Sequence, residues 1–254
     1  MSPVLEILIE PLKALRPETA SDRVLTALIV TIAFGMAAYL LRGVTRSGAL
    51  AGTFSAFVIF LGLGWGGFVT LLVVFVLTWL CTRLGSAKKQ QLGLAQDRAG
   101  RDAGQVLANV GSAAVFAALA LRNHWFVIAS VAALAEAAAD TTQSEIGEIA
   151  SGRAWLITTF REVAPGTDGG VSFPGMIAGT VAAVAVAITA RSTGVVKPGL
   201  AGVAAAAGFL GTIIDSLLGA TLERRGWLNN NGVNFLSTLA SGAMALALLR
   251  VLSG

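Results

Sequence analysis

Cysteine and histidine are almost absent from this chain. Among 254 residues there is one of each, Cys81 and His124, so intrachain disulfides and metal centres built from Cys and His are excluded. Any bound metal ion would need carboxylate and amide oxygens, a ligand set that favours Mg²⁺ or Mn²⁺. The chain also lacks a basic run with interleaved aromatic residues, so we expect no nucleic-acid partner.

Charge is scarce as well. Charged residues make up 13% of the sequence, against about 25% in soluble domains. Hydrophobic residues make up 55%, and the mean hydropathy is +0.77. This composition excludes an ordinary soluble domain and predicts an all-α, polytopic transmembrane bundle surrounded by membrane lipids. The net charge of +4 is ordinary for such a protein, because basic loops hold the cytoplasmic side.

Long apolar stretches indicate how many times the chain crosses the membrane. About 20 apolar residues span a bilayer as a helix, and we predict eight spans, with seven or nine also compatible. The glycine-rich turn 62–67 separates the second from the third. Residues 1–22 are expected to form an interfacial segment, and residues 23–254 a single transmembrane catalytic domain. The predicted spans are 24–41, 48–63, 66–82, 104–121, 125–142, 174–190, 199–222 and 232–250.

Lysine and arginine residues indicate the orientation of these spans. One side of the predicted topology holds 11 of them and the other holds 7, and the richer side is expected in the cytoplasm. The long polar loops 83–104 and 151–173 both fall on that side. We therefore expect an integral protein of a bacterial cytoplasmic membrane, with both termini outside and the site facing the cytoplasm. The sequence leaves the oligomeric state open.

Acidic residues stand inside two of the apolar stretches. Glu136 and Asp140 are four residues apart and share a helix face, and Asp215 lies near the end of another stretch. A charged side chain there costs roughly 2.5–3.5 kcal/mol on insertion scales, so such residues usually have a function. Both stretches end on the same predicted side, where Asp140, Glu145 and Asp215 could hold Mg²⁺. Simple pairing with arginine or with a neighbouring helix is the alternative.

The loop after the first acidic stretch is rich in Gly, Ser and Thr. Its glycines permit turns that aim backbone N–H groups at an anion, as phosphate sites require, although such a loop is often only a turn. Basic residues on the two cytoplasmic loops are candidate phosphate clamps, or else anchors that hold the loops in the cytoplasm. These patterns favour metal and phosphate chemistry at the membrane surface.

The candidate site residues fall into two groups. The predicted catalytic residues are Asp140, Glu145, Asp215, Arg101 and Arg161, and the three acids among them are the predicted metal ligands. The predicted nucleotide- and phosphate-binding residues are Lys88, Gln105, Asn109, Ser144, Thr158, Gly166, Thr167, Gly169, Gly170, Ser172, Ser216 and Asn234.

Motifs that include these residues resemble a known family over nearly the whole chain beyond the first span. They are Arg46–Gly52, Gly100-Arg101, Gln105–Asn109, Ala139–Thr141, Ser144-Glu145, Gly147, Leu156–Thr158, Val163, Pro165–Thr167, Gly169–Ser172, Asp215–Thr221 and Val233-Asn234. Together they resemble an integral membrane family that includes the plant phytyl-phosphate kinase of vitamin E synthesis. Their order is also similar, at the level of fold, to that of dolichol kinase and phosphatidate cytidylyltransferase.

The resemblance implies a kinase that transfers a phosphoryl group from CTP or another NTP to a prenyl monophosphate, such as phytyl or geranylgeranyl phosphate. Mg²⁺ or Mn²⁺ is the expected cofactor. A transporter or flippase for a lipid phosphate or an organic anion is one alternative, but its site would lie near the bilayer midplane. Here the polar residues gather at one end of the spans, which favours an enzyme. A CTP-dependent prenyl-phosphate cytidylyltransferase, which releases pyrophosphate, would use the same site and stays open.

Overall fold

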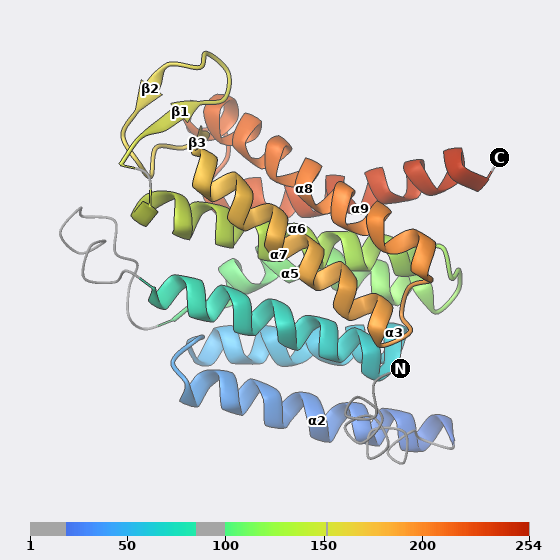
Figure 1. Cartoon of the computed structure of the whole chain (residues 1–254). Helices are drawn as coiled ribbons and strands as arrows, with labels where there is room; N and C mark the ends of the chain where they lie inside the picture. The colour runs from blue at the N-terminus through green and yellow to red at the C-terminus, as the bar shows by residue number, and fades with distance from the viewer. Residues whose placement is uncertain (1–18, 85–99, 151, 254) are drawn as a thin grey trace, which may run out of the picture.

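Helices form most of the structure, a computed structural model that describes residues 19–84, 100–150 and 152–253 (Figure 1). The predicted all-α membrane bundle is therefore confirmed. Residues 1–18 of the predicted interfacial segment lie outside the described residues, and α2 begins directly after them, capped by Thr19. The helices are α2 (Ala20–Leu40), α3 (Arg46–Arg83), α5 (Ala103–Ala120), α6 (Phe126–Ala150), α7 (Phe173–Ser192), α8 (Ala201–Leu218) and α9 (Asn230–Ser253).

The long helix α3 reverses its direction at Gly64. This residue has φ 69° and ψ −160°, a left-handed conformation that glycine adopts without steric cost. As a result, the start of α2 meets the middle of α3, where the Arg23 guanidinium donates to the Leu61 carbonyl at 2.7 Å. The end of α2 meets the end of α3, where Arg83 donates to the Leu41 carbonyl at 2.6 Å. The predicted turn at 62–67 is confirmed.

Six helical segments in the described part of the chain are long and apolar enough to cross a membrane, by length and composition. One of them is α3, which contains two antiparallel arms, and α6 is a further helix of 25 residues that carries the acids. Each of the eight predicted apolar stretches therefore has its own helix or helical arm. The short 3-10 helix η1 (Pro198–Leu200) leads into α8, and the π-helix η2 (Gly219–Glu223) follows α8.

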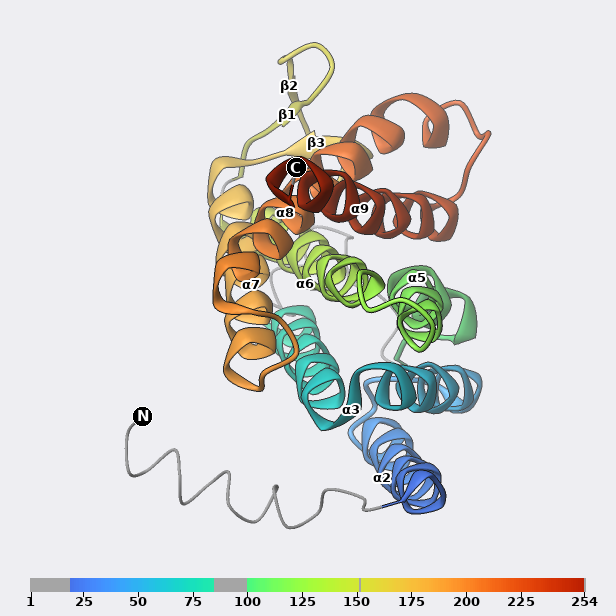
Figure 2. The ribbon, with the colours of Figure 1, turned by 90° about the vertical axis from the view of Figure 1, so that its right-hand side faces the viewer.

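Helix α6 is the centre of the bundle (Figure 2). It contacts α3, α5, α7, α8 and α9, and nearly every side chain from Val127 to Ala139 is buried. Small residues allow this close approach. A Cβ added at Gly208 would lie 2.8 Å from the Ala135 side chain, and one added at Gly179 would lie 2.9 Å from the Ala139 carbonyl. The acids of α6 are thus held inside protein, away from lipid.

A small antiparallel sheet closes one end of the bundle. Its strands are β1 (Ala154–Leu156), β2 (Glu162–Val163) and β3 (Gly170–Val171), in the order β2-β1-β3. Figure 1 shows this sheet at the same end as the last turns of α6 and the start of α5. The sequence predicted only a loop here, because strands of two or three residues are too short to show a periodic pattern.

Candidate active site

A polar pocket of about 210 Å³ lies at the end of the bundle that carries the sheet. Helices α5, α7 and α9 begin at this pocket, because Gln105, Ser172 and Asn230 from their first turns or caps line it. Helix N-termini carry partial positive charge and favour anions. Helix α6 and the α8–η2 segment end there and contribute carboxylates. The pocket therefore combines features that bind anions with features that bind cations.

Most of the predicted site residues line this pocket, although they come from segments far apart in the sequence. The structure brings together Arg101, Gln105, Asn109, Asp140, Ser144, Glu145, Gly166, Thr167, Gly169, Gly170, Ser172, Asp215, Ser216 and Asn234.

Two aspartates meet within the pocket. Asp140 on α6 and Asp215 on α8 place their carboxyl groups within hydrogen-bond reach of each other. The Ser237 hydroxyl on α9 donates to Asp215 Oδ2 at 3.1 Å. One turn deeper, Glu136 is 1% exposed and its Oε1 has no hydrogen-bond partner among the described residues. Like charges this close need a shared proton or a bound cation to be stable.

Arg101 faces this acidic pair from the start of α5. Its backbone is fixed by pairing with the loop before α3: its N–H donates to the Gly43 carbonyl at 3.1 Å, and its carbonyl accepts from Thr45 N at 3.0 Å. Its guanidinium donates to Thr141 Oγ1 at 3.2 Å. Burial lowers the pKa of Arg101 from its ordinary value, and the charge of Asp140 partly opposes this effect. An arginine retains its proton at neutral pH even so.

Two glycines allow the backbone around Arg101 to pack closely against the loop before α3 and against the first turn of α3. Gly100 has φ 87°, and a Cβ there would lie 2.7 Å from Val44 N. Gly48, in the first turn of α3, faces the Arg101 carbonyl so closely that any added Cβ would collide with it. Both residues belong to the motifs that carried the family resemblance, and this close contact gives the physical reason for glycine at each.

The glycine-rich loop is anchored to η2 at Gly169. This residue has φ 73°, and an added Cβ would collide with the backbone and side chain of Ala220. Its carbonyl accepts from Ile157 N at 3.1 Å, which ties the loop to the sheet. Within the loop, Thr167 N donates to Ala164 and Gly170 N donates to Thr167. These two N–H groups therefore already have acceptors within the loop. Only the remaining N–H groups of the loop could bind a phosphate as predicted.

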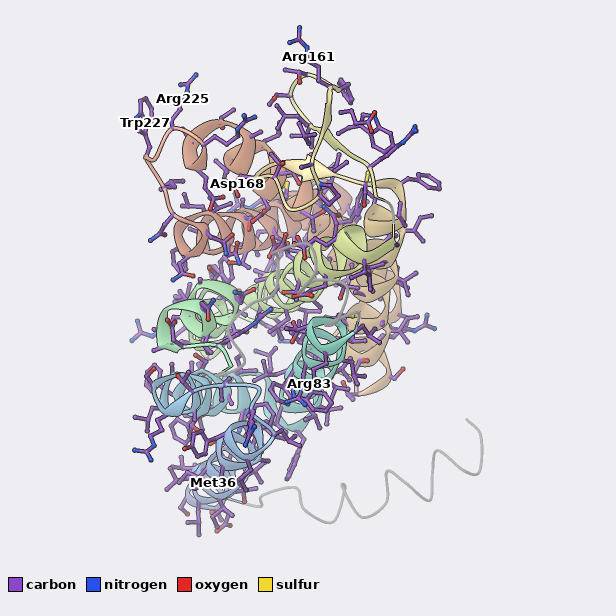
Figure 3. All side chains as sticks on the ribbon, turned by 90° about the vertical axis from the view of Figure 1, so that its left-hand side faces the viewer. Met36, Arg83, Arg161, Asp168, Arg225 and Trp227 are labelled. Carbon is purple, nitrogen blue, oxygen red and sulfur yellow. The ribbon has the colours of Figure 1, made fainter. Side chains whose placement is uncertain are left out.

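Thr158 and Arg161 do not belong to the pocket lining. The pairing of Trp155 with Glu162 places both residues at the turn between β1 and β2, where both are exposed. Figure 3 shows the Arg161 side chain extending away from the bundle, whereas Asp168 lies over the end of it. The prediction placed Thr158 and Arg161 at the site together with Gly166 to Ser172, but the β1–β2 hairpin holds its tip away from the pocket. Lys88 lies outside the described residues.

Glu145 lines the pocket but does not join the two aspartates. Among the described residues, no three His, Cys, Asp or Glu side chains form a group that could hold a metal ion. The reason is helical geometry: positions 140 and 145 are five residues apart, roughly 140° around the helix axis. The three predicted carboxylate ligands therefore do not come together as one group, and of the three only Asp140 and Asp215 meet.

The pair still fits a magnesium ion. Mg²⁺ is usually held by one or two protein carboxylates, with waters and substrate phosphates completing its octahedral shell. Asp140 and Asp215 supply that number of carboxylates, and the side-chain amides of Asn109 and Asn234 line the same pocket. These residues would hold the ion if the protein uses one.

Several pocket residues were not among those selected from the sequence. They are Thr141, Gln143, Gly147, Glu148, Ala154, Pro165, Asp168, Gly219, Glu223, Asn230 and Asn231. Glu223 follows Asp215 by eight residues, so a continued helical face would have pointed to it. Glu223 is the last residue of the π-helix η2, whose turn is wider than that of an α-helix. Such π-helical turns are frequent at functional sites. Asn230 and Asn231 read as a turn, and nothing local marks them as pocket residues.

A model of the integral membrane protein family DUF92 matches residues 29–242. The chain belongs to this family. The family assignment made from the motifs is confirmed, and with it the integral membrane character of the protein.

Relatives of this DUF92 protein occur in bacteria, archaea and plants. An uncharacterised membrane protein of Synechocystis is 31% identical over 75% of this chain and 77% of its own length. One from Methanocaldococcus jannaschii is 33% identical over 81% of this chain and 85% of its own. The chloroplastic protein VTE6 of Arabidopsis thaliana is 27% identical over 82% of this chain and 66% of its own. No solved structure matches significantly.

Proposed function

We propose that this DUF92 protein is a membrane-embedded prenyl-phosphate kinase. It transfers a phosphoryl group from CTP or another NTP to a prenyl monophosphate at the cytoplasmic surface. The observation that carries the proposal is the polar pocket in which the aspartates of α6 and α8 face Arg101. The prenyl acceptor comes from the resemblance to the family of the plant phytyl-phosphate kinase, and distant similarity to VTE6 supports it.

The chemistry of such a transfer suits the residues present. A prenyl phosphate is already an anion, so its oxygen attacks the terminal phosphorus without a strong general base, the bond from that phosphorus to the β–γ bridging oxygen breaks, and the nucleoside diphosphate leaves. The obstacle is the repulsion between two anions and the charge that spreads over the transferred group. Arg101 opposes that charge from α5, and the starts of α7 and α9 add their partial positive charge. A metal ion bound by Asp140 and Asp215 would supply further positive charge to the phosphates.

The remaining pocket residues position the donor. Asn109 and Asn234 can hydrogen-bond to phosphate or to a nucleotide base, and Ser144 presents an exposed hydroxyl on α6. The loop residue Thr167 and the α7 cap Ser172 line the same pocket. Because these groups sit where the helices end, a soluble nucleotide can reach them while the lipid remains in the membrane.

Label transfer tests this function directly. Purified protein is incubated with geranylgeranyl phosphate, Mg²⁺ and CTP labelled either in the γ-phosphate or in the α-phosphate. The kinase incorporates only the γ-label into lipid, and the other nucleoside triphosphates are then compared. Incorporation of the α-label would instead identify a cytidylyltransferase. No incorporation, together with movement of the lipid phosphate across proteoliposome membranes, would identify a transporter.

A further inference from the structure

A second, larger cavity of about 520 Å³ lies beside the polar pocket, between α2, α3, α5 and α6. The two cavities share three lining residues, Arg101, Gln105 and Asn109. Unlike the polar pocket, the second cavity has a mostly apolar interior wall. That wall is formed by Phe34, Ala38, Leu71, Val74, Phe75, Val106 and Val110.

Three glycines line this cavity, Gly35, Gly48 and Gly52, and one of them leaves free space in it. Added Cβ atoms at Gly35 and Gly48 would collide with Thr53 and with the Arg101 carbonyl, so these two glycines let α2, the first arm of α3 and the approach to α5 pack closely. At Gly52, an added Cβ would be 3.8 Å from the nearest atom, Val106 Cγ1. That is an ordinary van der Waals distance, so the chain has room for a side chain here but carries none.

The cavity is long in the direction of the helices. Its lining on the second arm of α3 runs from Leu71 to Arg83, which corresponds to about 18 Å at the rise of an α-helix. The hydrocarbon core of a bilayer is about 30 Å thick. The cavity therefore extends over little more than half of the hydrocarbon core, so it matches a chain that enters from one side of the membrane and does not reach the other side.

Positive charge is concentrated at one end of the cavity. Arg42, Arg83 and Arg101 all line it there. Arg83 also packs over Trp79, 4.5 Å from the ring centroid, and Figure 3 labels its position. Arg42 has φ 54°, a left-handed conformation that glycine would adopt more easily. A strained position that keeps a long cationic side chain points to a use for that charge.

We infer that this cavity holds the hydrocarbon chain of the acceptor, with its phosphate at Arg101. The inference rests on the proposed function and assigns its lipid substrate to a site of its own. The chain lies between Phe34, Val74 and Val110, and the arginines at the mouth neutralise the phosphate. Arg101 stands at the junction of the cavities, so the acceptor phosphate meets the nucleotide in the polar pocket. The occupant is a single-chain prenyl phosphate, because the proposed function supplies such a lipid and the apolar wall of the cavity leads to a cationic end.

Filling the cavity tests the inference. The Gly52→Phe variant places a ring inside it without a backbone collision, and glycine is a poor helix former to begin with. Gly202→Phe is the matched control, because Gly202 is exposed on α8 and an added Cβ there meets nothing within 4 Å. Binding of geranylgeranyl phosphate, isopentenyl phosphate and CTP to each purified protein is measured by titration calorimetry.

Gly52→Phe should weaken geranylgeranyl phosphate binding by at least about tenfold, the effect of losing roughly two buried methylene contacts. Binding of CTP and of the short isopentenyl phosphate should be unchanged, and the control should behave as wild type. Arg42→Gly provides a second variant, since it relieves the left-handed conformation while removing a charge. It should weaken geranylgeranyl phosphate binding by about tenfold or more.

Two results would overturn the inference. One is unchanged geranylgeranyl phosphate affinity in every variant that folds. The other is equally tight binding of dioleoyl phosphatidic acid, which would make the cavity a general lipid site. The kinase activity is judged separately by label transfer: if wild type binds geranylgeranyl phosphate in this cavity but transfers no γ-label, the lipid site stands and the proposed function fails. If wild type binds no geranylgeranyl phosphate yet phosphorylates isopentenyl phosphate, the function stands and the lipid site fails.

Discussion

Asp140 on α6 and Asp215 on α8 place their carboxyl groups within hydrogen-bond reach of each other, at the same end of the bundle. Arg101 interacts with Asp140 across the pocket, and Ser237 donates to Asp215. Two acids in contact repel one another unless a cation or a proton lies between them. This relationship is the reason to expect a metal ion here, and it leads to the first test.

Asp140→Asn and Asp215→Asn should each lower phosphoryl transfer by at least about a hundredfold, as expected when a metal contact is lost. Both variants should fold, because asparagine is nearly isosteric and removes a repulsion between neighbouring carboxylates. Turnover is measured at limiting Mg²⁺, and Glu162→Gln on the exposed strand β2 is the control. Near-normal turnover in either aspartate variant would remove that residue from the metal site.

Arg101 and Arg161 provide a matched pair of arginine tests. Arg101→Ala should reduce kcat/KM by about ten- to a hundredfold, since a charge-assisted hydrogen bond contributes about 1.5–3 kcal/mol. Arg161→Ala should leave both kcat and the KM for nucleotide unchanged, because Arg161 lies at the exposed tip of the hairpin (Figure 3). Steady-state kinetics with the labelled NTP decide the comparison. A loss on Arg161→Ala equal to that of Arg101→Ala would mean that the hairpin closes over the pocket.

Comparison of Gly169→Val with Gly152→Val distinguishes the effect of backbone strain on nucleotide binding from the effect of a packing collision. Both glycines have positive φ, 73° and 58°, so valine is strained at either by about 1–2 kcal/mol. Only Gly169 faces Ala220, whereas nothing lies within 4 Å of a Cβ at Gly152. Gly169→Val should therefore weaken nucleotide binding much more than Gly152→Val does. Equal effects, measured by titration with CTP, would exclude the loop anchor on η2 as the cause.

The orientation of the bundle is tested with single cysteines after Cys81 is replaced by serine. Cysteine at Glu162, on the sheet, should react with an impermeant maleimide only from the cytoplasm. Cysteine at Arg122, between α5 and α6, should react only from the opposite side. The excess of Lys and Arg on the loops at the pocket end supports this orientation. Reaction of both positions from one side would contradict the bundle as a transmembrane structure, and exchanged sides would place the pocket outside.

Much of the architecture could be predicted from the sequence. Apolar stretches of span length required helices, since lipid offers no partner for an unpaired backbone group. The glycine-rich turn 62–67 was recognisable, because Gly64 supplies a conformation that other residues avoid. The intramembrane acids Asp140 and Asp215 were also recognisable as site residues, since their cost in an apolar span is high.

Other features could not be predicted from local patterns. Glu145 was grouped with the aspartates, but the turn of the α6 helix places it elsewhere on the wall. The charge and loop position of Arg161 predict that it binds phosphate, but the pairing of β1 with β2 places Arg161 at the hairpin tip. The sequence at Asn230 and Asn231 is typical of a turn, although α9 begins with these residues and both line the pocket.

The sequence by itself therefore determined the class of protein, the helical segments, the family and the side chains that could carry charge into the membrane. Hydropathy and helix geometry act within about 20 residues, which is the range that such patterns cover. Only the tertiary structure decided which of these side chains meet. Asp140 and Asp215 come together, and the two cavities join at Arg101, because glycines let the helix backbones approach to contact distance. That approach depends on packing between distant segments, which no local pattern encodes.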